Sequence, residues 1–229
     1  LPQVLVRFIA SMVISQRYRI EVSGLDRVPA QGGVLLLGNH ISWVDWAILQ
    51  IASPRPIRFV MDRGLYERWY LRWFLDSFGV IPIGSVGARD ALSEVRECLN
   101  RGEVVGLFPE GGISRTGHLG EFKRGYETAA AGADGVIVPF YLRGLWGSSF
   151  SRASPKLRTI RGGALRRRII CAFGEPQPMS LPVEQLKRRV FELSIEAWQQ
   201  HTRRLPTIPE AWLATAKRLR GDMAIADTL

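Results

Sequence analysis

Two residues able to do acid–base chemistry lie close together in the segment Gly38-Asn39-His40-Ile41-Ser42-Trp43-Val44-Asp45. A neutral imidazole beside a hydroxyl can act as a general base, because its ordinary pKa lies near neutral pH. A carboxylate bound to the other ring nitrogen fixes the tautomer and stabilises the imidazolium that forms. The spacing of His40 and Asp45 therefore predicts a general-base pair. A strand-end histidine bonded to the backbone, followed by a helix-capping aspartate, is the structural alternative.

A second segment whose residues could form a binding site is polar and glycine-rich and follows an apolar run. Its sequence is Pro109-Glu110-Gly111-Gly112-Ile113-Ser114-Arg115. Loops at strand ends are common places for binding sites. Glycines let backbone N–H groups approach an anion closely, and Arg115 could supply a fixed positive charge to a phosphate. An ordinary turn with a solvated arginine is equally compatible with this stretch alone.

The elements that must position these residues alternate along the chain between short apolar runs and helical patterns. This alternation predicts an α/β fold with a central, mostly buried mixed sheet flanked by helices. An N-terminal amphipathic helix is expected over 1–14, where Arg7 interrupts the apolar run. The predicted strands are the start of 19–29, 34–37, 58–61, 80–83, 104–108, 136–142 and 168–173, and the predicted helices are 65–78, 88–99, 121–131, 183–204 and 210–220.

Taken together, Asn-His-x-x-x-x-Asp and the later Phe-Pro-Glu-Gly resemble the motifs of the glycerolipid acyltransferase family, which includes the lysophosphatidic acid acyltransferases. The block 59–84 stands where that family has an acceptor-binding motif, and the resemblance covers about residues 15–180. It implies that His40 is the base and Asp45 its partner. Substrate binding is implied for Asn39, Arg63, Glu110, Gly111, Arg115 and Pro139, the last lying in a Val-Pro pair that resembles the final family motif.

The resemblance implies an acyl transfer in which a hydroxyl attacks a thioester of acyl-carrier protein or coenzyme A. No metal and no further cofactor are expected. The oxyanion would need hydrogen-bond donors, for which backbone N–H groups near the glycines are the candidates.

The sequence departs from the family pattern at one place. Many lysophosphatidic acid acyltransferases end the second block with Asp-Arg, whereas this chain has Ile81-Pro82-Ile83-Gly84, and Asp62-Arg63 stands where a lysine is expected. We therefore expect an acceptor whose phosphate already carries a head group, namely lysophosphatidylethanolamine. Lysophosphatidic acid is the alternative acceptor.

Within the family, the segments 69–74, 114–117 and 138–144 look most like the acyltransferase part of bifunctional 2-acylglycerophosphoethanolamine acyltransferase/acyl-carrier-protein synthetases. The tail, 210–218 and 224–227, resembles the opening of an adenylate-forming domain. The expected organisation is an acyltransferase domain over 1–204, followed by a linker and the possible start of a second domain over 205–229. Because the chain begins without methionine, it is expected to be part of a longer protein.

The charge balance predicts an anionic partner. The net charge is +10, and seven basic residues fall between Arg152 and Arg168. Such a surface suits an anionic membrane or an acidic carrier protein. An aromatic stripe over 65–78 could face lipid or pack in the core. No apolar run reaches the roughly 18–20 residues needed to span a bilayer, and the two cysteines form no disulfide framework. A peripheral location on the cytoplasmic face of the inner membrane is therefore expected.

Two other function classes compete with the acyltransferase interpretation. A non-catalytic basic module that binds membranes or nucleic acid would explain the charge. Nucleic-acid binding calls for aromatics interleaved with arginines, but here the aromatics cluster in 66–78 and the arginines after 150, so no nucleic-acid partner is expected. An esterase would need a nucleophile such as Ser42, which lacks the Gly-x-Ser-x-Gly context.

Overall fold

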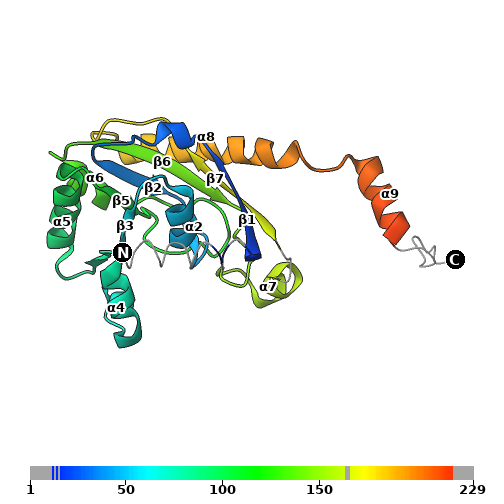
Figure 1. The fold of residues 1–229 in the computed structure, drawn as a ribbon, viewed down its shortest axis with the longest axis horizontal. Coiled ribbons are helices and arrows are strands. Elements are labelled where there is room, and N and C mark those ends of the chain that lie inside the picture. Colours follow the sequence, from blue (N-terminus) through cyan, green and yellow to red (C-terminus); the bar gives the residue numbers. More distant parts are fainter. Residues whose placement is uncertain (1–11, 13, 15, 163–165, 219–229) are drawn as a thin grey trace.

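The computed structural model describes residues 12, 14, 16–162 and 166–218, and most of the predicted N-terminal amphipathic helix lies outside them. The described chain forms an α/β fold around one seven-stranded sheet (Figure 1). The strand order is β1-β7-β6-β2-β5-β3-β4, and the pair β6–β7 is antiparallel while the other pairs are parallel. The sheet is thus mixed, as predicted. The strands are β1 (Tyr18–Ser23), β2 (Val34–Gly38), β3 (Ile57–Asp62), β4 (Ile81–Ile83), β5 (Val104–Leu107), β6 (Val136–Arg143) and β7 (Arg167–Phe173).

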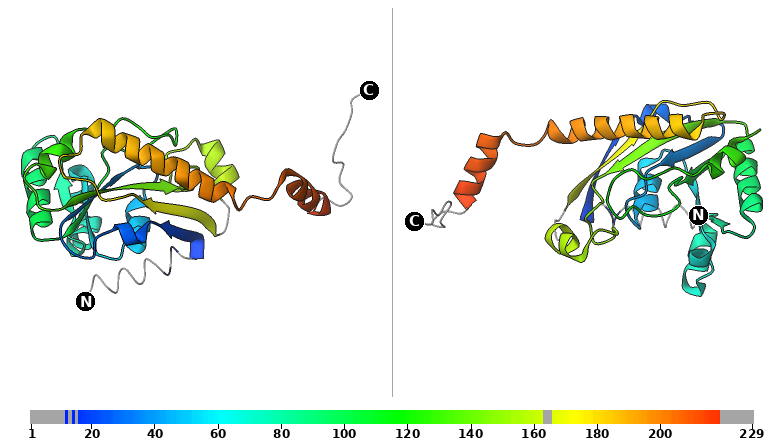
Figure 2. Two further views of the ribbon diagram at one scale, coloured as in Figure 1. Left: turned by 90° about the horizontal axis from the view of Figure 1, so that it is seen from above. Right: turned by 180° about the vertical axis from the view of Figure 1, so that it is seen from behind.

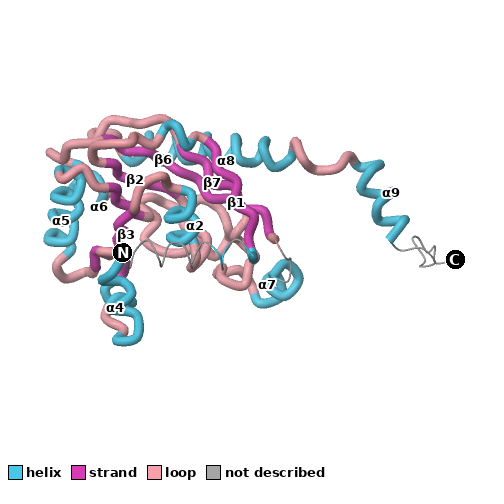
Figure 3. Tube along the Cα trace, in the orientation of Figure 1, coloured by secondary structure: helices cyan, strands magenta, loops and turns pink. Residues whose placement is uncertain are grey.

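Helices lie on both sides of this sheet (Figure 3). They are α2 (Asp45–Ala52), α3 (Arg63–Tyr66), α4 (Trp69–Ser77), α5 (Ala88–Asn100), α6 (Gly125–Ala130), α7 (Pro155–Gly162), α8 (Val183–Thr202) and α9 (Ile208–Arg218), with a 3-10 turn, η1, at Leu25–Arg27. Figures 1 and 2 show α9 standing away from the body of the molecule, beyond the end of α8.

Two predictions about helices need correction. The helix expected over 65–78 is two helices, because Arg68 has an extended backbone (φ −68°, ψ 116°) that separates α3 from α4. Asp62 caps the first of them by accepting a hydrogen bond from the N–H of Leu65 at 3.2 Å. Helices α2 and α7 were not among the predicted helices, and each is only eight residues long.

The core explains why β2 lies at the centre. All of its residues are buried, and alternate side chains enter separate hydrophobic clusters on the two faces of the sheet. Val34 and Leu36 pack with the α2 side, whereas Leu35 and Leu37 pack with the side covered by α5, α6 and α8. A strand buried on both faces reads as an unbroken apolar run, which is the pattern of 34–37.

The parallel strands also decide where the predicted site residues meet. Strands β2, β5, β3 and β4 run in one direction, so their carboxyl ends lie along one edge of the sheet. His40 follows β2, Glu110 follows β5, Arg63 follows β3 and Gly84 follows β4. Residues from four separate parts of the sequence are thereby gathered along the edge where α/β proteins usually bind their ligands.

Candidate active site

His40 and Asp45 form a hydrogen-bonded pair at this edge. Nδ1 of His40 lies 2.8 Å from Oδ2 of Asp45, and the carboxylate side chain is fully buried while 19% of the imidazole is exposed. An ionised carboxylate can only accept a hydrogen bond, so with Asp45 ionised the imidazole proton lies on Nδ1. Within the described part of the chain no hydrogen bond involves Nε2. The basic nitrogen is therefore left for an external hydroxyl.

The turn between the two residues is closed by the aspartate itself. Oδ2 of Asp45 accepts the backbone N–H groups of Ile41 at 2.6 Å and Ser42 at 2.9 Å. Asp45 is also the first residue of α2, where the helix dipole favours negative charge. Burial raises the pKa of the Asp45 carboxyl, and the hydrogen bonds from His40, Ile41 and Ser42 oppose that effect. The local sequence thus builds a rigid holder for one imidazole orientation.

Residues after β5 hold His40 from the other side. The ring of Phe108 stacks on the imidazole with 4.0 Å between the ring centroids. Oε1 of Glu110 accepts the backbone N–H of His40 at 3.0 Å, and the backbone N–H of Ser114 donates to the His40 carbonyl at 2.7 Å. The loop after β5 and the turn after β2 are therefore one hydrogen-bonded unit.

Glu110 uses both of its carboxylate oxygens in this unit. Oε2 accepts the backbone N–H of Gly120 at 3.3 Å, in addition to the bond between Oε1 and His40. Burial raises the pKa of Glu110, against the effect of these two hydrogen bonds. These contacts indicate that Glu110 positions the backbone of His40; its expected role in binding the acceptor stays a prediction.

Gly111 and a lysine that the sequence analysis missed lie against each other. Gly111 has a left-handed backbone (φ +67°), and a Cβ placed there would stand 2.6 Å from Nζ of Lys123. The backbone N–H of Gly111 donates to the Phe108 carbonyl at 3.0 Å, so it is already used. Lys123 is exposed and brings an ammonium group to this loop. Sequence reasoning passed over it because it lies twelve positions beyond Gly111.

Two residues that we expected to bind substrate are buried in structural roles. The Asn39 amide donates to the Leu142 carbonyl at 2.9 Å and accepts the Leu142 N–H at 2.7 Å, which joins the end of β2 to β6. Pro139 is a buried residue of β6 whose carbonyl accepts the N–H of Gly174 at 2.8 Å. Neither side chain is exposed at the edge of the sheet in this conformation.

The two arginines that we expected at the site are exposed at different positions along the edge. Arg115 follows Ser114, the residue bonded to the His40 backbone. Arg63 begins α3 and lies along the loop after β4: a Cβ at Gly84 would be 3.6 Å from its Nε, and one at Gly87 would be 3.5 Å from its Nη2. The guanidinium of Arg63 thus lies beside Gly84, where the sequence lacks the arginine found in many family members.

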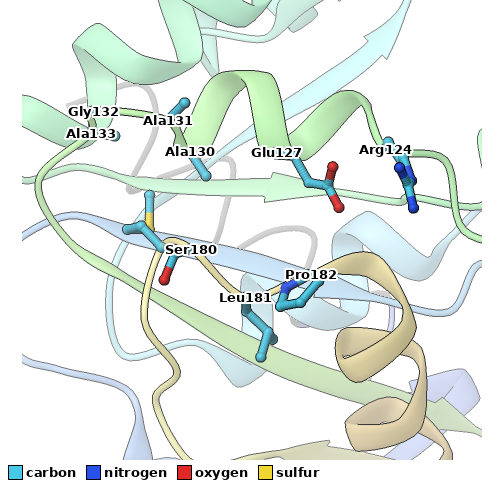
Figure 4. A pocket seen from close by; sticks show the side chains of 10 residues that line it. Arg124, Glu127, Ala130, Ala131, Gly132, Ala133, Ser180, Leu181 and Pro182 are labelled. Carbon is cyan, nitrogen blue, oxygen red and sulfur yellow. The ribbon is translucent and has the colours of Figure 1, made fainter.

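A hollow of about 550 Å³ lies elsewhere, between α6 and the segment before α8 (Figure 4). Its lining consists of small and apolar residues together with Arg124 and Glu127, and none of the predicted site residues is among them. Glu127 accepts the backbone N–H of Val183, and Arg124 pairs with Glu184. Its charged groups therefore have structural partners, and the hollow adds nothing to the chemistry of His40.

No helix in the described ranges combines the length and apolar character needed to cross a bilayer.

Comparisons with known proteins agree with the motifs. A family model described as Acyltransferase matches residues 19–143. The chain is 32% identical over 139 residues to the chloroplastic 1-acyl-sn-glycerol-3-phosphate acyltransferase LPAT1 of Arabidopsis thaliana, covering 59% of this chain and 39% of that protein. It is 24% identical over 184 residues to the 1-acyl-sn-glycerol-3-phosphate acyltransferase of Bacillus subtilis (strain 168), covering 80% of this chain and 92% of that protein. The match thus spans about two fifths of the plant relative and nearly all of the bacterial one.

The fold is also similar to a solved structure. The crystal structure of the 1-acyl-sn-glycerophosphate (LPA) acyltransferase PlsC from Thermotoga maritima superposes with a TM-score of 0.62 at 18% sequence identity. The match covers 83% of this chain and 75% of that chain. It supports the α/β architecture with its central mixed sheet.

Proposed function

This chain belongs to the acyltransferase family, and we propose that it moves a fatty acyl group from a thioester to the hydroxyl of a lysophospholipid, with His40 as general base. The observation that carries the proposal is the 2.8 Å contact between His40 and Asp45 at the carboxyl edge of the sheet. The second residue of the pair is buried and oriented by three hydrogen bonds.

The proposed reaction follows from this geometry. Nε2 of His40 takes the proton of the acceptor hydroxyl as its oxygen attacks the thioester carbonyl, and Asp45 stabilises the imidazolium. The tetrahedral intermediate then expels the thiolate, which receives the same proton from His40. The oxyanion needs donors. Since the N–H of Gly111 is already bonded to Phe108, we take the N–H of Gly112 as the candidate donor in that turn. No metal or cofactor enters these steps, and the donor is a thioester of coenzyme A or acyl-carrier protein.

Lysophosphatidic acid is the acceptor that the comparisons favour. The matching relatives in Arabidopsis thaliana and Bacillus subtilis are named 1-acyl-sn-glycerol-3-phosphate acyltransferases. Exposed cations along the edge suit a phosphate: Arg115 and Lys123 on the loop that holds His40, and Arg63 beside Gly84. In this proposal Arg63 supplies the charge that the sequence lacks at position 84.

Lysophosphatidylethanolamine is the second candidate acceptor. The observation in its favour is Gly84 itself, because a glycine leaves more room at the end of β4 than an arginine would. The similarity of 69–74 and 138–144 to bifunctional acyltransferase/synthetases points the same way. In that case 205–229 is a linker and the start of an acyl-activating domain, to which the exposed apolar residues of α9, Ile208 and Trp212, would contribute packing surface.

A panel of acceptors tests the proposal. The purified chain is incubated with radiolabelled palmitoyl-coenzyme A or palmitoyl-acyl-carrier protein, together with lysophosphatidic acid, lysophosphatidylethanolamine, lysophosphatidylcholine or glycerol 3-phosphate. We expect the highest kcat/KM with lysophosphatidic acid. A preference for lysophosphatidylethanolamine would keep the acyl transfer and replace the acceptor. Absence of product with every acceptor and both donors would overturn the proposed function.

A further inference from the structure

Two parts of the surface carry exposed aromatic rings and contact the segment that follows His40. The first is the outer face of α4, formed by Trp69, Tyr70 and Trp73, where 85% of Trp69 and 70% of Trp73 are exposed. The opposite face of α4 packs inward through Phe74, Leu75 and Phe78. A helix with tryptophans on its outer face and an apolar anchor on its inner face suits the interface of a bilayer.

The second part, here called the Trp43 surface, consists of Trp43, Phe150, Arg152, Lys156 and Arg158. Nearly half of each aromatic side chain is exposed, 47% for Trp43 and 46% for Phe150. The guanidinium of Arg152 lies over the Trp43 ring at 5.2 Å, and all three basic side chains are exposed. No aspartate or glutamate occurs in the sequence between Asp134 and Glu175, so nothing acidic in this stretch offsets the cations.

The Trp43 surface contacts the turn after His40, and the inner side of α4 contacts the start of α2. The backbone N–H of Trp43 donates to the Phe150 carbonyl at 3.0 Å, which ties the second surface to this turn. Trp46, one turn further along, packs edge-on against Phe74 of α4 and Phe78 just after it, with ring centroids 5.9 and 6.1 Å apart. Figure 1 shows α4 and α7 projecting from the same side of the sheet with α2 between them, while α8 lies on the other side.

We propose that the outer face of α4 and the Trp43 surface together dock this protein on an anionic phospholipid bilayer, so that the His40 turn between them opens toward the lipid head groups. The inference rests on the proposed function, because it locates the surface from which the lipid acceptor reaches His40. A bilayer is favoured over a carrier protein because aromatic side chains, rather than cations alone, project at two separate places on one side of the molecule.

The two surfaces contribute in different ways. On α4 and its flanks Arg68 and Arg72 are balanced by Glu67 and Asp76, so the attraction there comes from the tryptophans and does not depend on salt. The Trp43 surface carries only positive charge, so its contribution is weakened by salt and requires anionic lipid. The two halves of the docking surface can therefore be distinguished by how vesicle binding depends on salt and on anionic lipid.

Vesicle co-sedimentation tests the proposal. Unilamellar vesicles of phosphatidylethanolamine with 30% phosphatidylglycerol, and vesicles of phosphatidylcholine alone, are mixed with the wild-type chain and two double variants. We expect Trp69→Ser/Trp73→Ser to weaken binding to both kinds of vesicle by about tenfold or more. Lys156→Glu/Arg158→Glu should weaken binding to the phosphatidylglycerol vesicles by a similar factor, and most strongly at low salt.

Matched controls carry the same changes elsewhere. Trp212→Ser/Leu213→Ser removes exposed apolar residues from α9, and Arg188→Glu/Arg189→Glu makes the same change of net charge on α8. Both are expected to bind vesicles like wild type. Equal losses in the test and control variants, or wild-type binding by both test variants, would overturn the proposal.

A soluble assay separates this proposal from the proposed function. Each variant is given short-chain acyl-coenzyme A and a short-chain lysophosphatidic acid below its micelle concentration, without vesicles. Docking variants should keep wild-type kcat in this assay and lose activity only when the acceptor is presented in vesicles. If Lys156→Glu/Arg158→Glu instead binds vesicles normally and raises the KM for acyl-carrier protein, that half of the surface is a carrier-protein site and the docking proposal fails there.

Discussion

Four contacts fix the position of His40 at the end of β2. Asp45 binds Nδ1, Phe108 stacks on the ring, and Glu110 and Ser114 bond the backbone on either side. Orientation of this kind lowers the entropic cost of placing a base beside a hydroxyl. The base is therefore positioned by two sequence segments, the turn after β2 and the loop after β5.

Replacing Glu110 with glutamine tests its positioning role. An amide has one acceptor oxygen, so either His40 or Gly120 loses the partner of its backbone N–H. We expect kcat to fall by about tenfold, which corresponds to roughly 1.4 kcal/mol and lies within the cost of leaving a buried N–H unpaired. The KM for the lysophospholipid should change little. A large rise in KM at unchanged kcat would instead support the substrate-binding role that the motif suggested.

The site residues differ in how far the sequence could reveal them. His40 and Asp45 are five positions apart, and their meeting needs only one turn after a recognisable strand. The structural role of Asn39 could not be predicted, because its amide bonds to Leu142, 103 residues away. Lys123 was missed for a similar reason. Its contact with Gly111 depends on how the loop folds, and no sequence motif around either residue predicts it.

Among the helices and strands, the elements with a clear run or period of apolar residues were the ones that the sequence predicted. All seven predicted strands are present, because buried parallel strands read as apolar runs bounded by turns. The break between α3 and α4 was missed because the aromatic stripe continues through it, and α2 and α7 were missed because each is only eight residues long. The fold class therefore followed from the core, whereas the short helices were predicted less well.

A cluster of charged side chains joins β1, β7 and the end of α8 at the edge of the sheet opposite β4. Glu21 of β1 accepts hydrogen bonds from Arg168 of β7 at 2.7 Å and from Arg204, just after α8, at 2.8 Å. Arg168 also donates to the Gln200 carbonyl in α8. The hydrogen bond from Arg168 lowers the pKa of the Glu21 carboxyl, against the effect of burial. The end of α8 is thus fixed to the sheet edge by one carboxylate.

This cluster predicts a dependence of stability on pH. Because the pKa of Glu21 is lower in the folded chain than in the unfolded one, its contribution is fully present above the ordinary glutamate pKa of about 4.3 and is lost as pH falls through the lowered value. Glu21→Gln should reduce the free energy of unfolding at pH 7 by about 1–3 kcal/mol, and by much less near pH 3. Urea unfolding at both pH values measures this. Glu192→Gln, which removes an exposed ion pair on α8, is the control; equal losses at both pH values in Glu21→Gln would contradict the account.

At the scale of the whole molecule, the candidate site and the proposed docking surfaces lie toward one side of the sheet. The candidate base, the exposed cations of the edge and both proposed lipid-docking surfaces are connected to the turn after β2 or to the neighbouring strand ends. The opposite side is covered by α5, α6 and α8, whose buried residues form the second hydrophobic cluster. The positive net charge of +10 matches the proposed acceptor and the proposed bilayer, which are both anionic.

The proposed division of the chain also makes a prediction at this scale. Helix α9 stands away from the body (Figure 2), and its residues Ile208 and Trp212 are exposed. A chain that ends at Leu205 keeps Arg204 and its bond to Glu21, so we expect its kcat and its thermal midpoint to equal those of the full chain. Calorimetry and the soluble acylation assay measure the two quantities. A large loss of either would make 205–229 part of the acyltransferase unit.

The measurement that tests the central claim most directly is the single-turnover rate of acyl transfer by His40→Ala and Asp45→Asn, with His201→Ala as the matched histidine control near the end of α8. Removal of a general base should lower the rate of His40→Ala by about 100-fold or more. Asp45→Asn should also lower the rate strongly, since the imidazole loses the partner that sets its tautomer. His201→Ala should match wild type. If His40→Ala, shown by circular dichroism to be folded, transfers the acyl group at the wild-type rate, His40 is not the base and the account is wrong.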